Sequence, residues 1–145
     1  MKEGGLAVLT RIMQSFENEN TILCRACRVI GSLAHDKRVA AKLLIDHSIY
    51  YSVGQVIDRS TDEETLSMAI RAIHNLSDSK EHVAILGKNH IYPKLSGLLI
   101  KTENVNIHKK LLTTLSHVFN FMKRFTETSA HYWIGSEGGG KLVTR

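Results

Sequence analysis

The sequence predicts an all-α protein whose helices stack into a solenoid, and three observations support this prediction. Similar segments recur at offsets of 42 and 43 residues, a spacing typical of helical repeat arrays. Within these segments the apolar residues follow the i, i+3, i+4, i+7 spacing of a buried helix face. The 145 residues are 43% hydrophobic and include a single Pro, so one apolar core can form with few breaks in its helices.

The recurrence is clearest in a block at residues 25–33 that returns 43 residues later at 68–76. The residues that stand in register are Ala26 with Ala69, Arg28 with Arg71, Ile30 with Ile73, and Leu33 with Leu76. A third copy follows at 111–118, and a second block that begins at Ile49 returns at Ile91. The chain is therefore expected to hold successive copies of one structural unit.

The first unit, residues 4–34, is expected to contain two helices. One begins near Gly4-Gly5-Leu6, and the longer one carries a buried stripe. The stripe consists of Leu23, Ala26, Cys27, Ile30 and Leu33. Because the array opens in mid-unit without a polar helix to cover its apolar face, we expect a fragment or truncated form of a longer repeat protein.

The second unit, residues 36–76, is expected to contain three helices. Two short ones cover residues 37–46 and 49–57, and a long one follows. A capping box predicts where the long helix starts, because the Thr61 hydroxyl can accept from the third amide while Glu64 reaches back. The buried stripe of this helix consists of Leu66, Ala69, Ile70, Ile73 and Leu76.

The third unit, residues 80–122, repeats this order, with short helices at 81–87 and 91–99 and a long helix through 111–118. Residues 1–125 are thus expected to form the repeats. Residues 126–145 show no matching periodicity and become rich in glycine, so we expect a flexible tail. Part of this tail fits a phosphate-binding loop, but Leu142 replaces the Ser or Thr that would hold magnesium.

The order of these motifs resembles the armadillo-repeat family. Residues 91–95, with Pro93 in place, are similar to the opening of the family's second helix, and residues 72–77 are similar to the end of its third helix. The resemblance implies a right-handed superhelical α-solenoid of three-helix repeats, and a HEAT-type array is the nearest alternative. It also implies a non-catalytic protein-interaction module, a scaffold or an adaptor.

The resemblance further implies a concave groove, lined by third helices, in which a ladder of Asn side chains binds an extended peptide. Only Asn75 matches that Asn, and arginines or Thr113 stand where peptide-carrier members have Trp. Because Arg repels basic ligands and pairs bidentately with carboxylate or phosphate, the predicted ligand is an acidic or phosphorylated segment of a partner protein. The predicted groove residues are Arg25, Arg28, Ser32, Arg71, Asn75, Lys110, Thr113 and His117. Ordinary solvated helix faces are the alternative interpretation.

The net charge of +5 is unevenly distributed. Residues 1–99 carry 12 basic and 11 acidic side chains, whereas residues 100–145 carry 7 and 3. This last third contains both basic and aromatic residues, namely Lys109, Lys110, Lys123 and Arg124 with Phe119, Phe121 and Phe125. The alternative function is therefore a nucleic-acid-binding helical array.

Other chemistry finds no support in the sequence. Cys24 and Cys27 have the spacing of a redox motif but lie within a helical pattern, so we expect them to be buried and structural. The eight histidines are scattered, and no metal site, cofactor, small-molecule substrate or catalytic group is predicted. No signal peptide or membrane segment is expected either, and two cysteines without a disulfide framework favour the cytoplasm or the nucleus.

Overall fold

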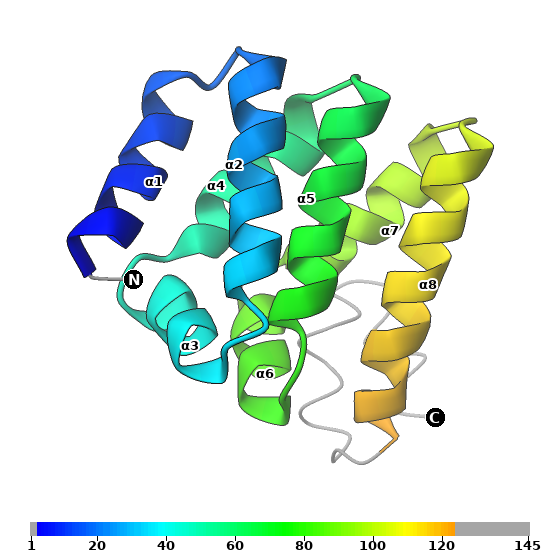
Figure 1. Cartoon of the computed structure of the whole chain (residues 1–145). Helices are drawn as coiled ribbons and strands as arrows, with labels where there is room; N and C mark the ends of the chain where they lie inside the picture. The colour runs from blue at the N-terminus through cyan, green and yellow to red at the C-terminus, as the bar shows by residue number, and fades with distance from the viewer. Residues whose placement is uncertain (1–2, 124–145) are drawn as a thin grey trace.

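The computed structural model describes residues 3–123, and every regular element in this part of the chain is an α-helix (Figure 1). The helices are α1 (Glu3–Ser15), α2 (Asn20–Leu33), α3 (Lys37–Ile45), α4 (Ile49–Arg59), α5 (Glu63–Leu76), α6 (Lys80–Lys88), α7 (Ile91–Lys101) and α8 (Val105–Met122). The predicted all-α solenoid is confirmed. The predicted tail at 126–145 lies outside the described residues.

The three longest helices, α2, α5 and α8, form one layer. They lie side by side at the front of Figure 1, with α5 packed against both of its neighbours. Behind them, α4 packs against α1 and against α7, while the short α3 and α6 contact each other at one end of the layers. The helices α2, α5 and α8 thus hold equivalent places in successive units, and we call them the third helices.

Short polar side chains cap the N-termini of four of the helices. The residues that accept a first-turn amide hydrogen are Asp36 at α3, Asp62 at α5, Ser79 at α6 and Asn104 at α8. The predicted cap at Thr61 is wrong by one residue, since Asp62 accepts from the amide of Thr65 at 3.0 Å. A carboxylate is favoured over a hydroxyl here because the helix dipole attracts negative charge to its N-terminus.

Two equivalent turns have left-handed backbone. Ser48 precedes α4 with φ 48°, and His90 precedes α7 with φ 64°. Residues other than glycine adopt this region rarely, and both turns fall at the break between the short first helix and the second helix of a unit. The repeat is therefore visible in the backbone of its turns as well as in its helices.

An aliphatic core runs through all the units. The predicted stripe residues of α5 are all buried, and those of α2 are buried except for the half-buried Leu33. Cys24 and Cys27 are buried free thiols. Burial raises the pKa of the Cys27 thiol to about 12, so this side chain is protonated and acts as an apolar core residue.

One buried polar contact joins α7 to the end of α5. The Tyr92 side chain is only 2% exposed, and its hydroxyl lies 2.7 Å from Ser77 Oγ. Because Ser77 Oγ donates its own hydrogen to the Ile73 carbonyl at 2.7 Å, Tyr92 is the donor to Ser77. Burial raises the pKa of Tyr92, which keeps the hydroxyl neutral and able to donate.

Candidate functional site

A hollow of about 360 Å³ opens between α5 and α8, two of the helices that were predicted to line the groove. We call it the α5–α8 hollow. Its lining residues are Ser67, Met68, Ile70, Arg71 and His74 from α5, and Lys109, Lys110, Thr113 and Thr114 from α8. Three of the predicted groove residues, Arg71, Lys110 and Thr113, are therefore brought together at one place.

Helical spacing explains why these side chains share the hollow. On α5, Arg71 and His74 are three residues apart, and on α8, Lys110 is followed three and four residues later by Thr113 and Thr114. Residues at these intervals lie on the same helix face. The aliphatic stripes occupy the adjoining faces of both helices, and Ile70 and Thr114 of the lining are buried. Packing of the stripes into the core leaves Arg71, Lys110 and Thr113 at the surface.

Positive charge dominates the α5–α8 hollow. Arg71, Lys109 and Lys110 are exposed, and no aspartate or glutamate stands among the lining residues. Within residues 3–123, none of these three cations forms an ion pair. Cations that gather without a counter-charge create a positive potential, which favours an anionic group between them.

Arg71 also reaches over the neighbouring α2. Its Nη1 lies 3.1 Å from the position that a Cβ would take at Gly31, and the Cα of Ala72 lies 3.6 Å from the same position. Gly31 is buried in α2. The missing side chain at Gly31 therefore leaves room for the Arg71 guanidinium to lie across the contact between α2 and α5.

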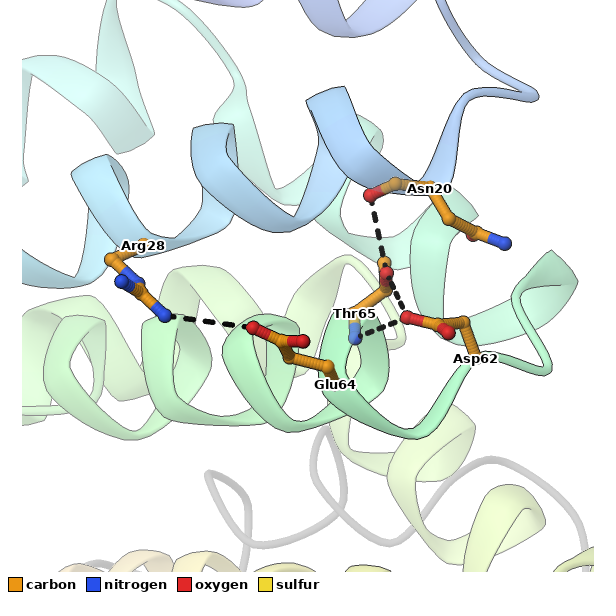
Figure 2. Close-up of polar contacts among 5 residues, drawn as sticks. All are labelled: Asn20, Arg28, Asp62, Glu64 and Thr65. Carbon is orange, nitrogen blue, oxygen red and sulfur yellow. Dashed lines mark hydrogen bonds and ion pairs between the residues drawn. The ribbon is translucent and has the colours of Figure 1, made fainter.

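The arginines of α2 have different surroundings. Figure 2 shows Arg28 pointing toward Glu64 on α5, and the two side chains form an ion pair at 3.7 Å. Arg25 lines a separate hollow of about 190 Å³ together with the carboxylates of Asp62 and Glu64. The positive charge of α2 therefore faces acidic side chains, whereas that of the α5–α8 hollow does not.

Hydrogen bonds at the start of α5 fix this acidic neighbourhood (Figure 2). The buried Thr65 hydroxyl lies 2.6 Å from Asp62 Oδ2 and 3.2 Å from the Asn20 carbonyl, which ties α5 to the first residue of α2. Hydrogen bonds from the Thr65 side chain and amide lower the pKa of Asp62. The Asp62 carboxylate is therefore held in its charged form next to the arginines of α2.

Asn75 and His117 occupy equivalent places near the ends of α5 and α8, and each side chain reaches back to the preceding third helix. Asn75 Nδ2 donates to the Gly31 carbonyl at 2.8 Å, and His117 Nε2 lies 2.7 Å from the Ser77 carbonyl. Carbonyls at a helix C-terminus lack an amide partner within their own helix. The ladder positions therefore join the third helices to each other, while the corresponding Ser32 of α2 is exposed.

The imidazoles of His74 and His117 are stacked where α5 meets α8. Their ring centroids lie 4.4 Å apart with an angle of 24° between the planes, and Phe121 packs edge-on against His117 at 5.5 Å. Burial and the neighbouring His117 lower the pKa of His74, while Asp78 opposes this shift. His74 therefore lines the α5–α8 hollow as a neutral ring.

Several lining residues were not among the predicted groove residues. His74 lies one residue before Asn75 and three after Arg71, so the spacing of one helix face was the signal that could have found it. Lys109 is predicted from the sequence only as part of the nucleic-acid alternative. Of the other residues behind that alternative, Phe119 is 47% exposed and Phe121 is partly buried, whereas Arg124 and Phe125 lie outside the described residues.

Metal ligation and membrane spanning by a helix find no support in the part of the chain that the structure describes. Over residues 3–123, no three His, Cys, Asp or Glu side chains gather closely enough to hold a metal ion. None of the described helices has the length and apolar character that crossing a membrane requires.

Comparison with protein families places the chain among repeat proteins. The family model ARM_ARMC5, described as ARMC5, matches residues 1–144. Comparison with curated proteins and with solved structures gave no match. The family match spans nearly the whole chain and agrees with the order of helices in Figure 1.

Proposed function

Since the chain belongs to the ARMC5 armadillo-repeat family, as the sequence motifs indicated, we propose that it is a non-catalytic protein-interaction module that acts as a scaffold or an adaptor. The module binds an extended acidic or phosphorylated segment of a partner protein along its third helices. The centre of binding is the α5–α8 hollow, and the predicted groove residues of α2 extend the surface on one side.

The observation that supports this proposal is the uncompensated charge of the α5–α8 hollow. Arg71, Lys109 and Lys110 line it from two helices, and no carboxylate lines the hollow. A ligand carboxylate or phosphate gains from all three cations, and Arg71 offers a planar fork that matches either group. A basic ligand would instead be repelled by the same three charges.

The lining also contains apolar surface. Met68 is partly buried and Ile70 is buried, and both line the hollow. A segment that places an apolar side chain beside its anionic group would cover this surface and gain from its removal from water. The preferred ligand is therefore an acidic segment with apolar residues interspersed, because a run of charges alone leaves Met68 exposed.

The arginines of α2 are expected to contribute less to binding. Arg28 is paired with Glu64 at 3.7 Å, and Arg25 lies beside the same glutamate and Asp62. An anionic ligand must compete with these carboxylates before it can use either arginine. Both partners of the Arg28–Glu64 pair are largely exposed, so the competition is weak and the arginines can still guide the ligand.

A peptide array tests this proposal. Matched peptides are synthesised in acidic, phosphoserine, neutral and basic forms around the same apolar residues, and binding of the purified chain is measured at several salt concentrations. We expect binding of the acidic and phosphorylated forms, with affinity falling moderately as salt rises. Equal binding of the basic forms, or no binding of any form, would contradict the proposal.

The same array can distinguish the nucleic-acid alternative. Single-stranded RNA and DNA of the same length are included, since phosphate backbones would also meet the exposed Lys109 and Lys110. A nucleic-acid-binding array releases condensed counterions, so its affinity falls steeply and linearly on a logarithmic salt scale. Tight binding of an oligonucleotide with this slope, and weak binding of every peptide, would favour the alternative function.

We also propose that the module works in the cytoplasm, the nucleus or both. Two buried free thiols, Cys24 and Cys27, support a reducing compartment. Imaging of the tagged chain tests this proposal, and retention in a secretory compartment would contradict it.

A further inference from the structure

We propose that the α5–α8 hollow takes up a proton when it binds its anionic ligand, and that the stacked imidazoles of His74 and His117 hold this proton. The inference rests on the proposed function, because it assigns a regulation to the same site. It follows from the position of His74, which lines a hollow rich in cations and is stacked on His117.

The geometry places the pair within reach of a bound anion. His74 lines the hollow together with Arg71, Lys109 and Lys110, and the His117 ring is stacked on it at 4.4 Å. A negative charge in the hollow therefore acts on the His74 ring directly and on the His117 ring through one layer of packing. Such a charge favours the protonated form of an imidazole.

His117 is already arranged as a donor. Its Nε2 lies 2.7 Å from the Ser77 carbonyl, which can only accept a hydrogen bond, so Nε2 carries a hydrogen. This hydrogen bond forms equally in the neutral and the protonated ring. His74 Nδ1 faces Thr114 Oγ1 at 3.4 Å, and a hydroxyl can either donate or accept there. The pair can therefore gain a proton without losing its contacts.

Charged groups surround the pair, but burial is what chiefly keeps His74 neutral before the ligand binds. From α5 the nearby cation is Arg71, and from α8 they are Lys109 and Lys110. The turn after α5 supplies one carboxylate, Asp78, which favours protonation of His74. Burial and the second imidazole outweigh that carboxylate, and the pKa of His74 lies below its ordinary value of 6.5.

The anionic ligand reverses this balance. It supplies negative charge on the side of His74 where the hollow is lined by cations and no carboxylate, so the pKa of His74 rises on binding. A group whose pKa rises on binding makes the affinity increase as the pH falls, by at most about tenfold per pH unit for one proton. The increase is confined to the range between the pKa values of His74 in the free and in the bound protein.

The probe used to measure the pH dependence of the affinity must not titrate in the same pH range. A phosphate group itself takes up a proton near pH 6, which would hide the effect. We therefore choose a fluorescein-labelled peptide in which glutamates alternate with leucines as the probe, since carboxylates with a pKa of about 4.3 stay charged between pH 6 and 8. Binding to the full chain is followed by fluorescence anisotropy across this range.

Two variants and one control assign the proton. His74→Gln and the double variant His74→Gln/His117→Gln keep hydrogen-bonding side chains but cannot take up a proton, and His35→Gln removes an exposed histidine outside the hollow. We expect the wild type and His35→Gln to bind roughly three- to tenfold more tightly at pH 6 than at pH 8. We expect the double variant to show little dependence on pH.

Calorimetry gives a measurement that needs no variant. Titrations of the wild type at pH 7 in two buffers of different ionisation enthalpy report the number of protons taken up on binding. A value clearly above zero is expected. If the Glu/Leu peptide binds with no proton uptake, or with the same pH dependence in the double variant, the inference is overturned while the proposed function stands. If the Glu/Leu peptide binds at no pH, the proposed function itself fails.

Discussion

Asn75 on α5 donates a hydrogen bond from Nδ2 to the backbone carbonyl of Gly31 on α2, at 2.8 Å. Gly31 lies near the C-terminus of α2, where carbonyls lack an intrahelical partner. The residue that resemblance places in a ligand-binding ladder therefore serves the contact between two successive units. His117 makes the equivalent bond from α8 to the Ser77 carbonyl at 2.7 Å, so both contacts between third helices are bonded in the same way. They differ in charge, because Arg28 of α2 faces Glu64 whereas no carboxylate lines the α5–α8 hollow.

Asn75→Ala should destabilise the fold more than it weakens ligand binding. The substitution leaves a carbonyl without its donor, which costs about 1–2 kcal/mol. Urea unfolding followed by circular dichroism measures the loss. Asn75→His should recover part of it, because His117 makes the equivalent bond to Ser77 in the next unit. Unchanged stability together with a large loss of peptide affinity would mean that Asn75 acts mainly on the ligand.

Gly31→Ala should change the affinity for an acidic peptide, because it displaces the Arg71 guanidinium, while changing stability little. The new Cβ would lie 3.1 Å from Arg71 Nη1, so the flexible arginine tip must move away from its position. Replacing a helical Gly by Ala gains about 0.5–1 kcal/mol in helix propensity, which offsets the crowding.

Gly97→Ala is the matched control for this substitution. Gly97 is exposed in α7, and nothing lies within 4 Å of its added Cβ. It should stabilise the fold by up to about 1 kcal/mol and leave the peptide affinity unchanged. Anisotropy titrations compare the two variants, and equal affinities would show that the position of Arg71 does not matter.

Glu64→Gln should increase the affinity for an acidic peptide by roughly two- to threefold, because it frees Arg28 and removes a nearby negative charge. Stability should change by less than about 0.5 kcal/mol, since the side chains of the Arg28–Glu64 pair are 58% and 71% exposed. Glu81→Gln on α6 changes the net charge equally without touching the third helices. A gain of the same size in that control would indicate a general charge effect.

Asp62→Asn should lower stability at neutral pH, with a difference from wild type that vanishes in acid. Hydrogen bonds from Thr65 hold the pKa of Asp62 below the ordinary 3.8 in the folded chain. A depressed folded pKa gives stability that is present above the unfolded value and is lost as the pH falls through the folded value. Chemical unfolding at pH 6 and at several values below pH 4 checks this, and a constant difference would refute it.

The helices could be predicted from the sequence because their causes are local or periodic. Apolar stripes such as the one from Leu66 to Leu76 need only the helical spacing and a common core. The predicted cap at Thr61 missed by one residue, since Asp62 competes for the same amides. The left-handed turns at Ser48 and His90 carry no glycine, so sequence alone gave no reason to expect them there.

The candidate site could be predicted only in part, because it depends on distances between helices. Helical spacing placed Arg71, Lys110 and Thr113 on the polar faces, and the structure brings them to one hollow. Arg28 looked equivalent to Arg71 in the repeat, yet it faces Glu64 across the gap between α2 and α5. No pattern within one helix reveals which charge on the next helix will stand opposite, so the difference between the two arginines required the fold.

The central claim is that the charges of the α5–α8 hollow bind an anionic segment. Arg71→Glu/Lys110→Glu reverses two of these charges, and Arg11→Glu/Lys80→Glu makes the same change in net charge at exposed positions of α1 and α6. Affinity for an acidic peptide is measured side by side for both variants, after circular dichroism has shown that each is folded.

We predict that the hollow variant loses affinity by tenfold or more, while the control stays within about threefold of the wild type, because distant exposed charges are screened by salt. Equal affinities of the two folded variants would contradict the account.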